Sequence, residues 1–187
     1  MNARKFVIAN PERCIGCRTC LAACLHAHDL TGESVEPRLQ FVSTLKVSTP
    51  ITCHHCVDAP CVASCPTGCL YSDENLVGIH EEKCIGCQNC VLACPFGAVT
   101  IKSKVKTKRF GNLEINCGWK PVVIKCDLCS HGPEGPGDLC SHRPEGPACV
   151  KACLTEGLML VDQDYLDNLS KEKRIQTAVA AEANLHS

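Results

Sequence analysis

Residues 84–95 read CIGCQNCVLACP, and this stretch decides how the chain of 187 residues folds. Three cysteines separated by two residues each are followed by a fourth cysteine three residues further on, and then by proline. Bacterial ferredoxins use this C-x2-C-x2-C-x3-C-P spacing to hold [4Fe–4S] clusters. Three thiolates bind one cluster from a single loop, and in two-cluster ferredoxins the fourth binds the other cluster. The stretch therefore predicts a fold organised by iron–sulfur clusters.

The same kind of run occurs four times, so the chain is an internal repeat of ligand runs. Gly16 and Gly86 lie inside ligand loops, where a residue free to adopt positive φ lets the backbone approach a cluster. Pro66 and Pro95 follow the last cysteine of their runs. Four runs predict four [4Fe–4S] clusters. The sixteen cysteines of the runs are Cys14, Cys17, Cys20 and Cys24; Cys53, Cys56, Cys61 and Cys65; Cys84, Cys87, Cys90 and Cys94; and Cys126, Cys129, Cys149 and Cys153.

The composition favours metal over an ordinary core or a disulfide framework. The hydrophobic fraction of 45% includes nineteen cysteines, and aromatic residues make up only 4%. Bound metal can supply the missing folding free energy. The odd number of cysteines, their tight repetitive spacing and the lack of an export signal in residues 1–11 argue against disulfides. Zinc is the chemical alternative, but zinc ribbons use paired C-x2-C knuckles rather than a triplet with an outlying fourth cysteine.

Charge and hydropathy exclude several classes of function. The formal net charge is −1, and sixteen thiolates with four oxidised cluster cores would bring it to about −9. Nucleic acid is therefore an unfavourable partner, since its binding needs a positive surface. No apolar run approaches the about 18 residues that cross a bilayer, so we expect a cytoplasmic protein without a transmembrane segment. The sequence shows no pterin or flavin motif, no P-loop and no catalytic triad, which predicts that it is not an enzyme.

Short strands and helices are expected around the runs. Residues 6–8, 76–79 and 98–101 are rich in β-formers and predict strands, whereas the apolar spacing in residues 17–28 predicts a helix. The polar, alanine-rich residues 164–185 predict a second helix. This tail either lies on the surface of its own chain or reaches a neighbouring subunit.

Residues 102–117 predict a β-hairpin. A Gly111-Asn112 turn separates two alternating segments. The first segment places a lysine at every second position, so one face of the strand is basic. That face is either an ordinary solvated face or a docking surface for an acidic partner. The lysines are Lys102, Lys104, Lys106 and Lys108.

The fourth run contains an insert that leaves one ligand open. Residues 127–148 hold a tandem copy with a period of eleven, rich in glycine and proline, which predicts a surface loop. Cys129 keeps the C-x2-C spacing from Cys126 and closes the smaller loop, which costs less entropy. Cys140, in the second copy, lies nearer in sequence to Cys149. We expect Cys129 to be the ligand, with Cys140 as the alternative.

Two further cysteines are expected to be packing residues. Cys69 occupies the position that Ala98 holds in the sister run, which predicts a small buried side chain. Cys117 is expected to be a strand residue packed in the core.

Four histidines lie in or near the runs. His54 and His55, inside the second run, are expected to donate to cluster sulfur or to line the surface. His26 and His28 follow the first run, and we expect them on the surface of the helix.

The order and the amino-acid sequences of the runs resemble those of a known protein family. The matching stretches cover roughly residues 5–160 and are specific. They resemble the four-cluster electron-transfer subunits of molybdopterin oxidoreductases, the dimethyl-sulfoxide-reductase iron–sulfur subunit group. Within that group they are most similar to the small subunit of formate hydrogenlyase and its counterparts in hydrogen-dependent carbon dioxide reductase. The stretches are RCIGCRTC at 13–20, CHHCVDAPC at 53–61, CVLACPFGA at 90–98, KCDLC at 125–129 and GPAC at 146–149.

The resemblance implies that the first run pairs with the fourth and the second with the third. The implied fold is α+β, with two interleaved ferredoxin-like lobes and little regular secondary structure. One lobe would comprise residues 1–48 and 117–162, the other residues 49–116, and residues 163–187 would form a helical tail. Leu154 departs from the proline that usually follows the last cysteine. The implied ligand sets are set A (Cys14, Cys17, Cys20, Cys153), set B (Cys24, Cys126, Cys129, Cys149), set C (Cys53, Cys56, Cys61, Cys94) and set D (Cys65, Cys84, Cys87, Cys90).

The function implied by the resemblance is a non-catalytic relay of single electrons. Its partners would be a molybdenum or tungsten formate dehydrogenase and a hydrogenase or second ferredoxin-like subunit. Three alternatives stay open: a polyferredoxin scaffold of a larger, self-assembling complex, an electron-transfer subunit of another molybdopterin oxidoreductase, and a free ferredoxin.

Overall fold

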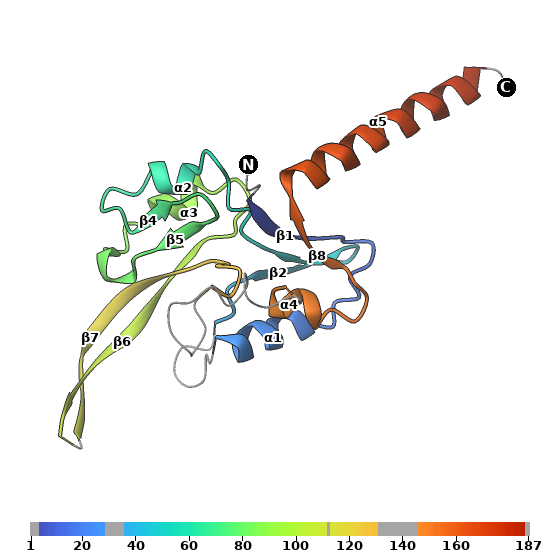
Figure 1. Ribbon diagram of the computed structural model, residues 1–187. Coiled ribbons are helices and arrows are strands. Elements are labelled where there is room, and N and C mark those ends of the chain that lie inside the picture. The colour runs from blue at the N-terminus through green and yellow to red at the C-terminus, as the bar shows by residue number, and fades with distance from the viewer. Residues whose placement is uncertain (1–3, 29–35, 112, 131–145, 186–187) are drawn as a thin grey trace.

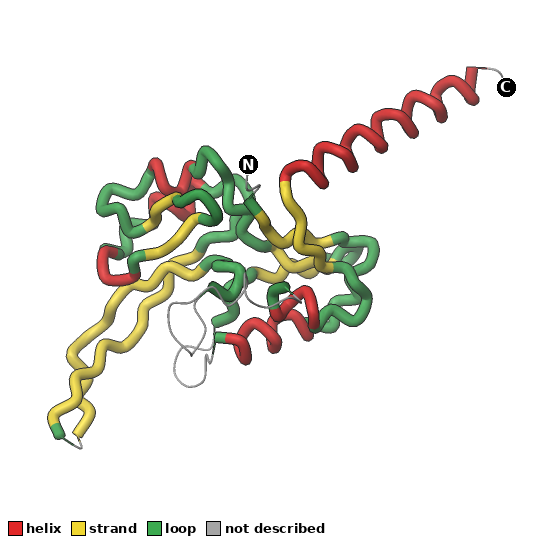
Figure 2. The backbone as a smooth tube through the Cα atoms, in the orientation of Figure 1, coloured by secondary structure: helices red, strands yellow, loops and turns green. Residues whose placement is uncertain are grey.

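The computed structural model describes residues 4–28, 36–111, 113–130 and 146–185, which form short elements joined by long loops (Figures 1 and 2). The strands of this part of the chain pair antiparallel in two-stranded sheets. Mixed α and β structure with little regular secondary structure is therefore confirmed. The elements are β1 (Lys5–Ala9), α1 (Thr19–Ala27), β2 (Gln40–Ser43), β3 (Ser48–Ile51), α2 (Pro60–Ala63), β4 (Leu70–Ser72), β5 (Val77–Ile79), the 3-10 turn η1 (Glu81–Lys83), α3 (Asn89–Ala93), β6 (Thr100–Phe110), β7 (Leu113–Ile124), α4 (Ala148–Lys151), β8 (Leu158–Asp162) and α5 (Gln163–Leu185).

Segments from the two ends of the chain meet in one part of the molecule, which we call the end half. β1 pairs with β8 in the register Lys5↔Asp162 to Ala9↔Leu158, and α1 packs beside α4 (Figure 1). Cysteines take many of the positions that aliphatic side chains usually fill in a core. The buried side chains of this core are Val7, Cys20, Cys24, Leu39, Cys53, Ala98, Cys126, Leu128, Cys149 and Leu158.

The middle of the chain forms a second part with the same plan, which we call the middle half. β4 pairs with β5 in the register Leu70↔Ile79 to Ser72↔Val77, and α2 packs beside α3 (Figure 1). The helix α2 begins at Pro60, whose fixed φ suits the first turn of a helix. Its core contains Ala59, Cys61, Cys69, Leu70, Val77, Cys90, Val99 and Val123.

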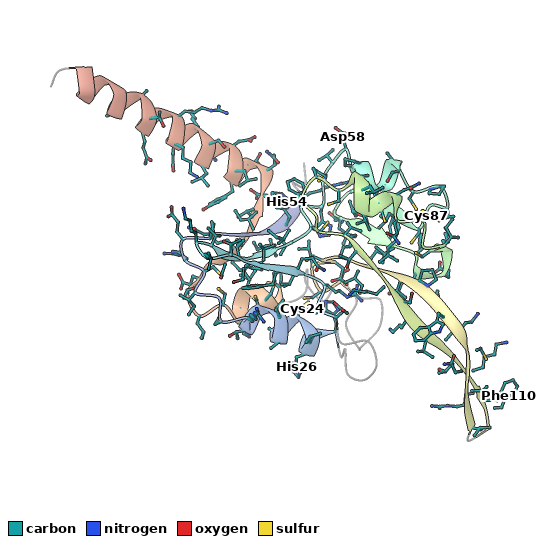
Figure 3. All side chains as sticks on the ribbon, turned by 180° about the vertical axis from the view of Figure 1, so that it is seen from behind. Cys24, His26, His54, Asp58, Cys87 and Phe110 are labelled. Carbon is teal, nitrogen blue, oxygen red and sulfur yellow. The ribbon has the colours of Figure 1, made fainter. Side chains whose placement is uncertain are left out.

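Two elements project from this body. The β6–β7 hairpin pairs from Thr100↔Ile124 to Phe110↔Leu113, and Phe110 lies at its far end (Figure 3). The helix α5 continues from β8 and points away from the body (Figure 1). The Asp162 carboxylate caps it by accepting a hydrogen bond from the N–H of Tyr165 at 2.9 Å. None of the helices in the described ranges combines the length and apolarity that a membrane span requires.

Most of the predicted elements are confirmed. The strands at 6–8 and 76–79, the helix within 17–28, the hairpin and the tail helix are present, although the strand predicted at 98–101 begins only at Thr100. Cys69 is buried, and His26 is exposed on α1. Asn112, most of the insert and its Cys140 lie outside the described residues.

Two predictions are wrong. Cys117 is exposed rather than packed in the core, because β7 runs along a hairpin that projects from the body and has no core against this stretch. His28 is not a surface residue: its side chain is 1% exposed and paired with Asp127. The reason is its position at the C-terminal end of α1, which faces the fourth cysteine run.

Candidate iron–sulfur centres

The first and third cysteine runs share one backbone conformation. Gly16 and Gly86 have φ values of 74° and 76°, and Arg18 and Gln88 have φ values of 61° and 64°. Glycine adopts this left-handed conformation without the steric penalty of a Cβ atom. α1 and α3 begin directly after Arg18 and Gln88. The first two cysteines of each run therefore lie on a curved loop and the third on the first turn of a helix.

The fourth cysteine of the second and third runs is followed by the same turn. In residues 65–68 and 94–97 the last N–H donates to the first carbonyl, at 3.4 and 3.3 Å. Pro66 and Pro95 occupy the second position of these turns, where a fixed φ is favourable. The two prolines thus turn the chain immediately after a cysteine of set D and of set C.

The fourth run closes the same turn without proline. The N–H of Glu156 donates to the carbonyl of Cys153 at 3.1 Å. Leu154 stands in the proline position, and Glu156 adopts a φ of 51° where the other two turns have glycine. The departure of Leu154 from the family pattern therefore leaves the turn intact.

The thiols of set A lie together in the end half. Burial, together with the neighbouring thiols of Cys17, Cys14 and Cys153, raises the pKa of Cys20 to about 11. The Cys153 sulfur accepts a hydrogen bond from the N–H of Gly157 at 3.2 Å. Cys17 is exposed, so this set reaches the surface.

Set B is buried deeper. Burial, together with the adjacent thiols of Cys129 and Cys24, raises the pKa of Cys149 to about 12. Burial also holds the pKa of Cys126 well above its ordinary value, again with Cys149 as a neighbour. Cys129 therefore lies beside its expected partners, while Cys140 is outside the described residues.

The thiols of set C lie where the two halves meet. Burial, together with the neighbouring thiols of Cys53, Cys94 and Cys56, raises the pKa of Cys61 to about 11. The N–H of His55 donates to the Cys53 sulfur at 3.5 Å. Cys53 belongs to the core of the end half and Cys61 to that of the middle half, so this set bridges the two cores.

Set D lies in the middle half. Burial raises the pKa of Cys90, and the thiols of Cys65, Cys84 and Cys87 raise it further. Cys87 is exposed and lies toward the outer side of this half (Figure 3). Cys69 is a fifth thiol here: burial and the neighbouring Cys84 and Cys65 raise its pKa to about 12.

Electrostatic influence between thiols and shared buried cores indicate which sets are neighbours in space. The thiol of Cys20 in set A contributes to the raised pKa of Cys149 in set B. The thiol of Cys53 in set C contributes in the same way to the raised pKa of Cys126 in set B. Cys61 of set C and Cys90 of set D share one core. The sets therefore form a row A–B–C–D, although the runs follow another order along the chain. Among the described cysteines of the four sets, exposed ones occur only in the two end sets, A and D.

The side chains present fit [4Fe–4S] clusters. The donors are thiols, and backbone N–H groups point at them, as between Arg38 and the Cys24 sulfur at 3.3 Å. The buried Nε2 of His55, between Cys53 and Cys56, has no hydrogen-bond partner among the described residues, and a cluster bound there would offer acceptors. Within the same residues no three ligating side chains lie close enough to hold a single metal ion. A four-iron core is larger than one ion and spreads its thiolates further apart.

A buried ion-pair network lies beside set B. The Asp127 carboxylate lies 3.3 Å from Nε2 of His28 and 3.1 Å from Nη1 of Arg38, and it accepts the N–H of Cys129 at 3.0 Å. Burial alone would lower the pKa of His28, but the hydrogen bond with Asp127 raises it to about 11. Burial alone would raise the pKa of Asp127, but His28 and Arg38 lower it to about 2. His28 also interacts with the thiols of Cys129 and Cys24.

Of the two histidines of the second run, His55 is buried and His54 is half-buried. His54 stacks between Phe6, at a centroid distance of 5.3 Å, and Phe96, at 3.9 Å, and so links β1 to the turn after Cys94. Nδ1 of His55 accepts the N–H of Val77 at 3.1 Å. Burial lowers the pKa of His54 and, together with the charge of Lys125, that of His55 to about 3.

Sequence reasoning missed the charged residues around the fourth run. Lys125 and Asp127 are buried on either side of Cys126, and Arg38 reaches Asp127 from a loop far away in sequence. The only available signal was their position between ligands in residues 125–129, a stretch that has to lie inside if its cysteines hold a cluster.

Rows of grouped thiols on glycine-containing loops define a ferredoxin-type iron–sulfur protein. Comparison with known proteins supports this class: models of the 4Fe-4S binding domain match residues 77–100 and 11–26. Electron transport protein HydN of Escherichia coli K12 is 39% identical over 94% of this chain and 98% of its own length. Hydrogenase-4 component A and formate hydrogenlyase subunit 2 of that strain are each 35% identical over 91% of this chain and 88% of theirs. The chain belongs to this family of 4Fe–4S electron-transfer proteins.

The same unit also occurs within a larger protein. The putative oxidoreductase AegA of Escherichia coli K12 is 35% identical over 93% of this chain, but the match covers only 24% of its length. Nearly the whole chain described here thus corresponds to a module that is found both alone and fused.

Proposed function

We propose that the chain binds four [4Fe–4S] clusters, one in each thiol set, and relays single electrons along the row. Reversible one-electron oxidation and reduction is the chemistry that such clusters supply when bound. The chain's own residues hold the clusters in sequence, keep water from the inner two and expose the outer two. The proposed ligands are the members of sets A, B, C and D, with Cys129 rather than Cys140 in set B.

The observation that carries this proposal is the row with two exposed ends. Set A reaches the surface at Cys17 and set D at Cys87, while neighbouring thiols connect the sets between them. Beside each exposed cysteine lies an exposed apolar side chain, Ile15 at 68% and Ile85 at 63%. Exposed apolar side chains next to a redox centre suit transient or stable docking of a protein partner. Each end of the row therefore serves one partner.

The arrangement supports two interleaved ferredoxin-like lobes as the plan of the body. One lobe comprises residues 1–48 and 117–162 and carries sets A and B. The other comprises residues 49–116 and carries sets C and D. Residues 163–187 form the tail. The repeated local plan of a strand pair beside a helix pair in the two halves is the support for this division.

We infer that the protein is a non-catalytic subunit. Its relatives are named as an electron transport protein and as components of hydrogenase-4 and formate hydrogenlyase. The partners would then be a molybdenum or tungsten formate dehydrogenase at one end and a hydrogenase or second ferredoxin-like subunit at the other. The exposed lysines of the β6–β7 hairpin offer an additional basic surface for an acidic partner.

Replacing one ligand tests the relay. Cys84→Ser, in set D, should remove most of the electron flow from formate to hydrogenase in the purified complex, while each partner keeps its activity with artificial dyes. Cys117→Ser is the matched control, because Cys117 is an exposed cysteine outside the four sets. Unimpaired coupling in the Cys84→Ser complex would reject the relay.

The projecting helix α5 favours a second, compatible role in assembly. It extends away from the body (Figure 1) and exposes Ile175 and Val179, so it is available to a neighbouring subunit or a second copy. Removing residues 165–187 should reduce the size of native assemblies, measured by size-exclusion chromatography, without lowering the iron content. An unchanged particle size would rule out this scaffold role.

A further inference from the structure

Lys125 is a fully buried cation between the two halves of the protein. Its side chain is 0% exposed, and its Nζ donates to the carbonyl of Cys126 at 2.9 Å and to that of Val77. Cys126 belongs to the core of the end half and Val77 to that of the middle half. The ammonium group therefore lies at the junction of the two cores.

This charge has no anion of its own in the described structure. The nearby carboxylate of Asp127 is already paired with His28 and Arg38, and no ion pair joins Lys125 to a described acidic residue. Two carbonyl groups satisfy its hydrogen bonds but not its charge. Burying an ammonium group without a counter-charge is costly, so a negative group of another kind is expected beside it.

We propose that Lys125 raises the reduction potentials of the two inner clusters, those of sets B and C, by stabilising their reduced forms. The inference rests on the proposed function, because it requires clusters in these sets. Four thiolates and an oxidised core together carry a charge of about −2, and reduction makes this more negative. A fixed positive charge that is buried away from bulk solvent favours the more negative state.

Two observations locate the effect in sets B and C. Lys125 directly precedes Cys126 of set B, to whose carbonyl it is bonded. Its Nζ also donates to the carbonyl of Val77, which lies in the same buried core as Cys61 of set C. Sets A and D lie beyond these inner sets in the row. Lys125 is thus a positioning charge for the middle of the relay, and it keeps the inner steps accessible to an electron entering from either end.

The test uses the full-length protein, purified without oxygen, in its wild-type form and as Lys125→Gln. Glutamine is neutral yet still donates hydrogen bonds to carbonyl groups. Iron and sulfide are counted first, and the cluster potentials are then measured by redox titration followed by electron paramagnetic resonance. We expect two of the four potentials to move to more negative values and the other two to stay unchanged. Lys108→Gln is the matched control, because it removes the same charge from an exposed site on the hairpin and should shift no potential.

The outcomes separate this inference from the proposed function. A wild-type protein with far fewer than the expected about sixteen irons would overturn the four-cluster proposal itself. A fully loaded Lys125→Gln protein with wild-type potentials would overturn the role of Lys125 alone. If Lys125→Gln does not retain iron, Lys125→Arg decides: full iron and wild-type potentials with arginine support a required positive charge. Iron loss with arginine as well would show a packing role and overturn the proposal.

Discussion

The end half and the middle half repeat one local plan, but they assemble it from very different lengths of chain. In the end half α1 meets α4 across about 120 intervening residues, whereas in the middle half α2 meets α3 across about 25, a difference worth about 1 kcal/mol of loop-closure entropy. The end half also contains the buried ion pairs of Asp127. The described residues of the middle half show no network of that kind. The half that joins segments distant in sequence thus contains buried ion pairs. The half that joins segments close in sequence forms without such pairs among its described residues.

The largest expected effect comes from breaking that network. Asp127→Ala should destabilise the protein by about 3–5 kcal/mol, because it leaves the buried His28 and Arg38 without their counter-charge. Hydrogen exchange should locate the loss in β1, β8, α1 and α4. Chemical unfolding of the anaerobic holo-protein gives the magnitude. Asp58→Ala, at an exposed aspartate of the middle half, is the control and should change stability by less than about 0.5 kcal/mol. Equal losses in both variants would contradict a special role for the end-half network.

A matched pair of valines compares the two cores directly. Val7 in β1 and Val77 in β5 are 0% and 1% exposed. Either one changed to alanine should cost about 2 kcal/mol from lost burial and the cavity left behind. The Val7→Ala protein should also release iron to a chelator faster than the Val77→Ala protein, because the β1–β8 pair closes the longer loop. Equal release rates would mean that chain length between the partners does not control cluster retention.

Much of this plan could be predicted from the sequence, because cysteine spacing and hydrophobic period are local signals. In the runs at 14–24 and 84–94, cysteine spacing and glycine predict the ligand loops. Alternating residues on both sides of Gly111 predict the hairpin. The pairing of His28 with Asp127 could not be predicted in this way. It joins positions that are distant in sequence, and a histidine after an amphipathic helix has the same pattern whether it is solvated or paired. The prediction that Cys117 packs in the core was wrong because alternation indicates a strand but does not show whether a core lies against it.

Two equivalent glycines sharpen the comparison at the level of the ligand loops. Gly16 and Gly86 share a positive φ, so alanine at either position should cost about 1–2 kcal/mol. A Cβ at Gly16 would lie 3.4 Å from the side chain of Ser48, which can rotate away, whereas at Gly86 it would lie 3.0 Å from the ring of Pro121. Gly86→Ala should therefore be the more damaging of the two. Thermal unfolding and iron content measure this order. If Gly16→Ala were the more damaging variant, the distance from the new Cβ to its neighbour would not be what determines the loss of stability.

The smallest expected effect is a gain in stability at the one turn that departs from the common pattern. Gly68 and Gly97 hold the left-handed position after Cys65 and Cys94, while Glu156 holds it after Cys153. Glu156→Gly should relieve the steric cost of a Cβ in that conformation and stabilise the protein by up to about 1 kcal/mol, reduced by the greater freedom of glycine in the unfolded chain. The lost pair with Arg13, at 3.9 Å between exposed side chains, contributes little. Glu156→Ala separates the two terms, since it removes the carboxylate but keeps the Cβ. If alanine stabilises as much as glycine, the carboxylate and not the backbone is what sets this corner apart from the other two.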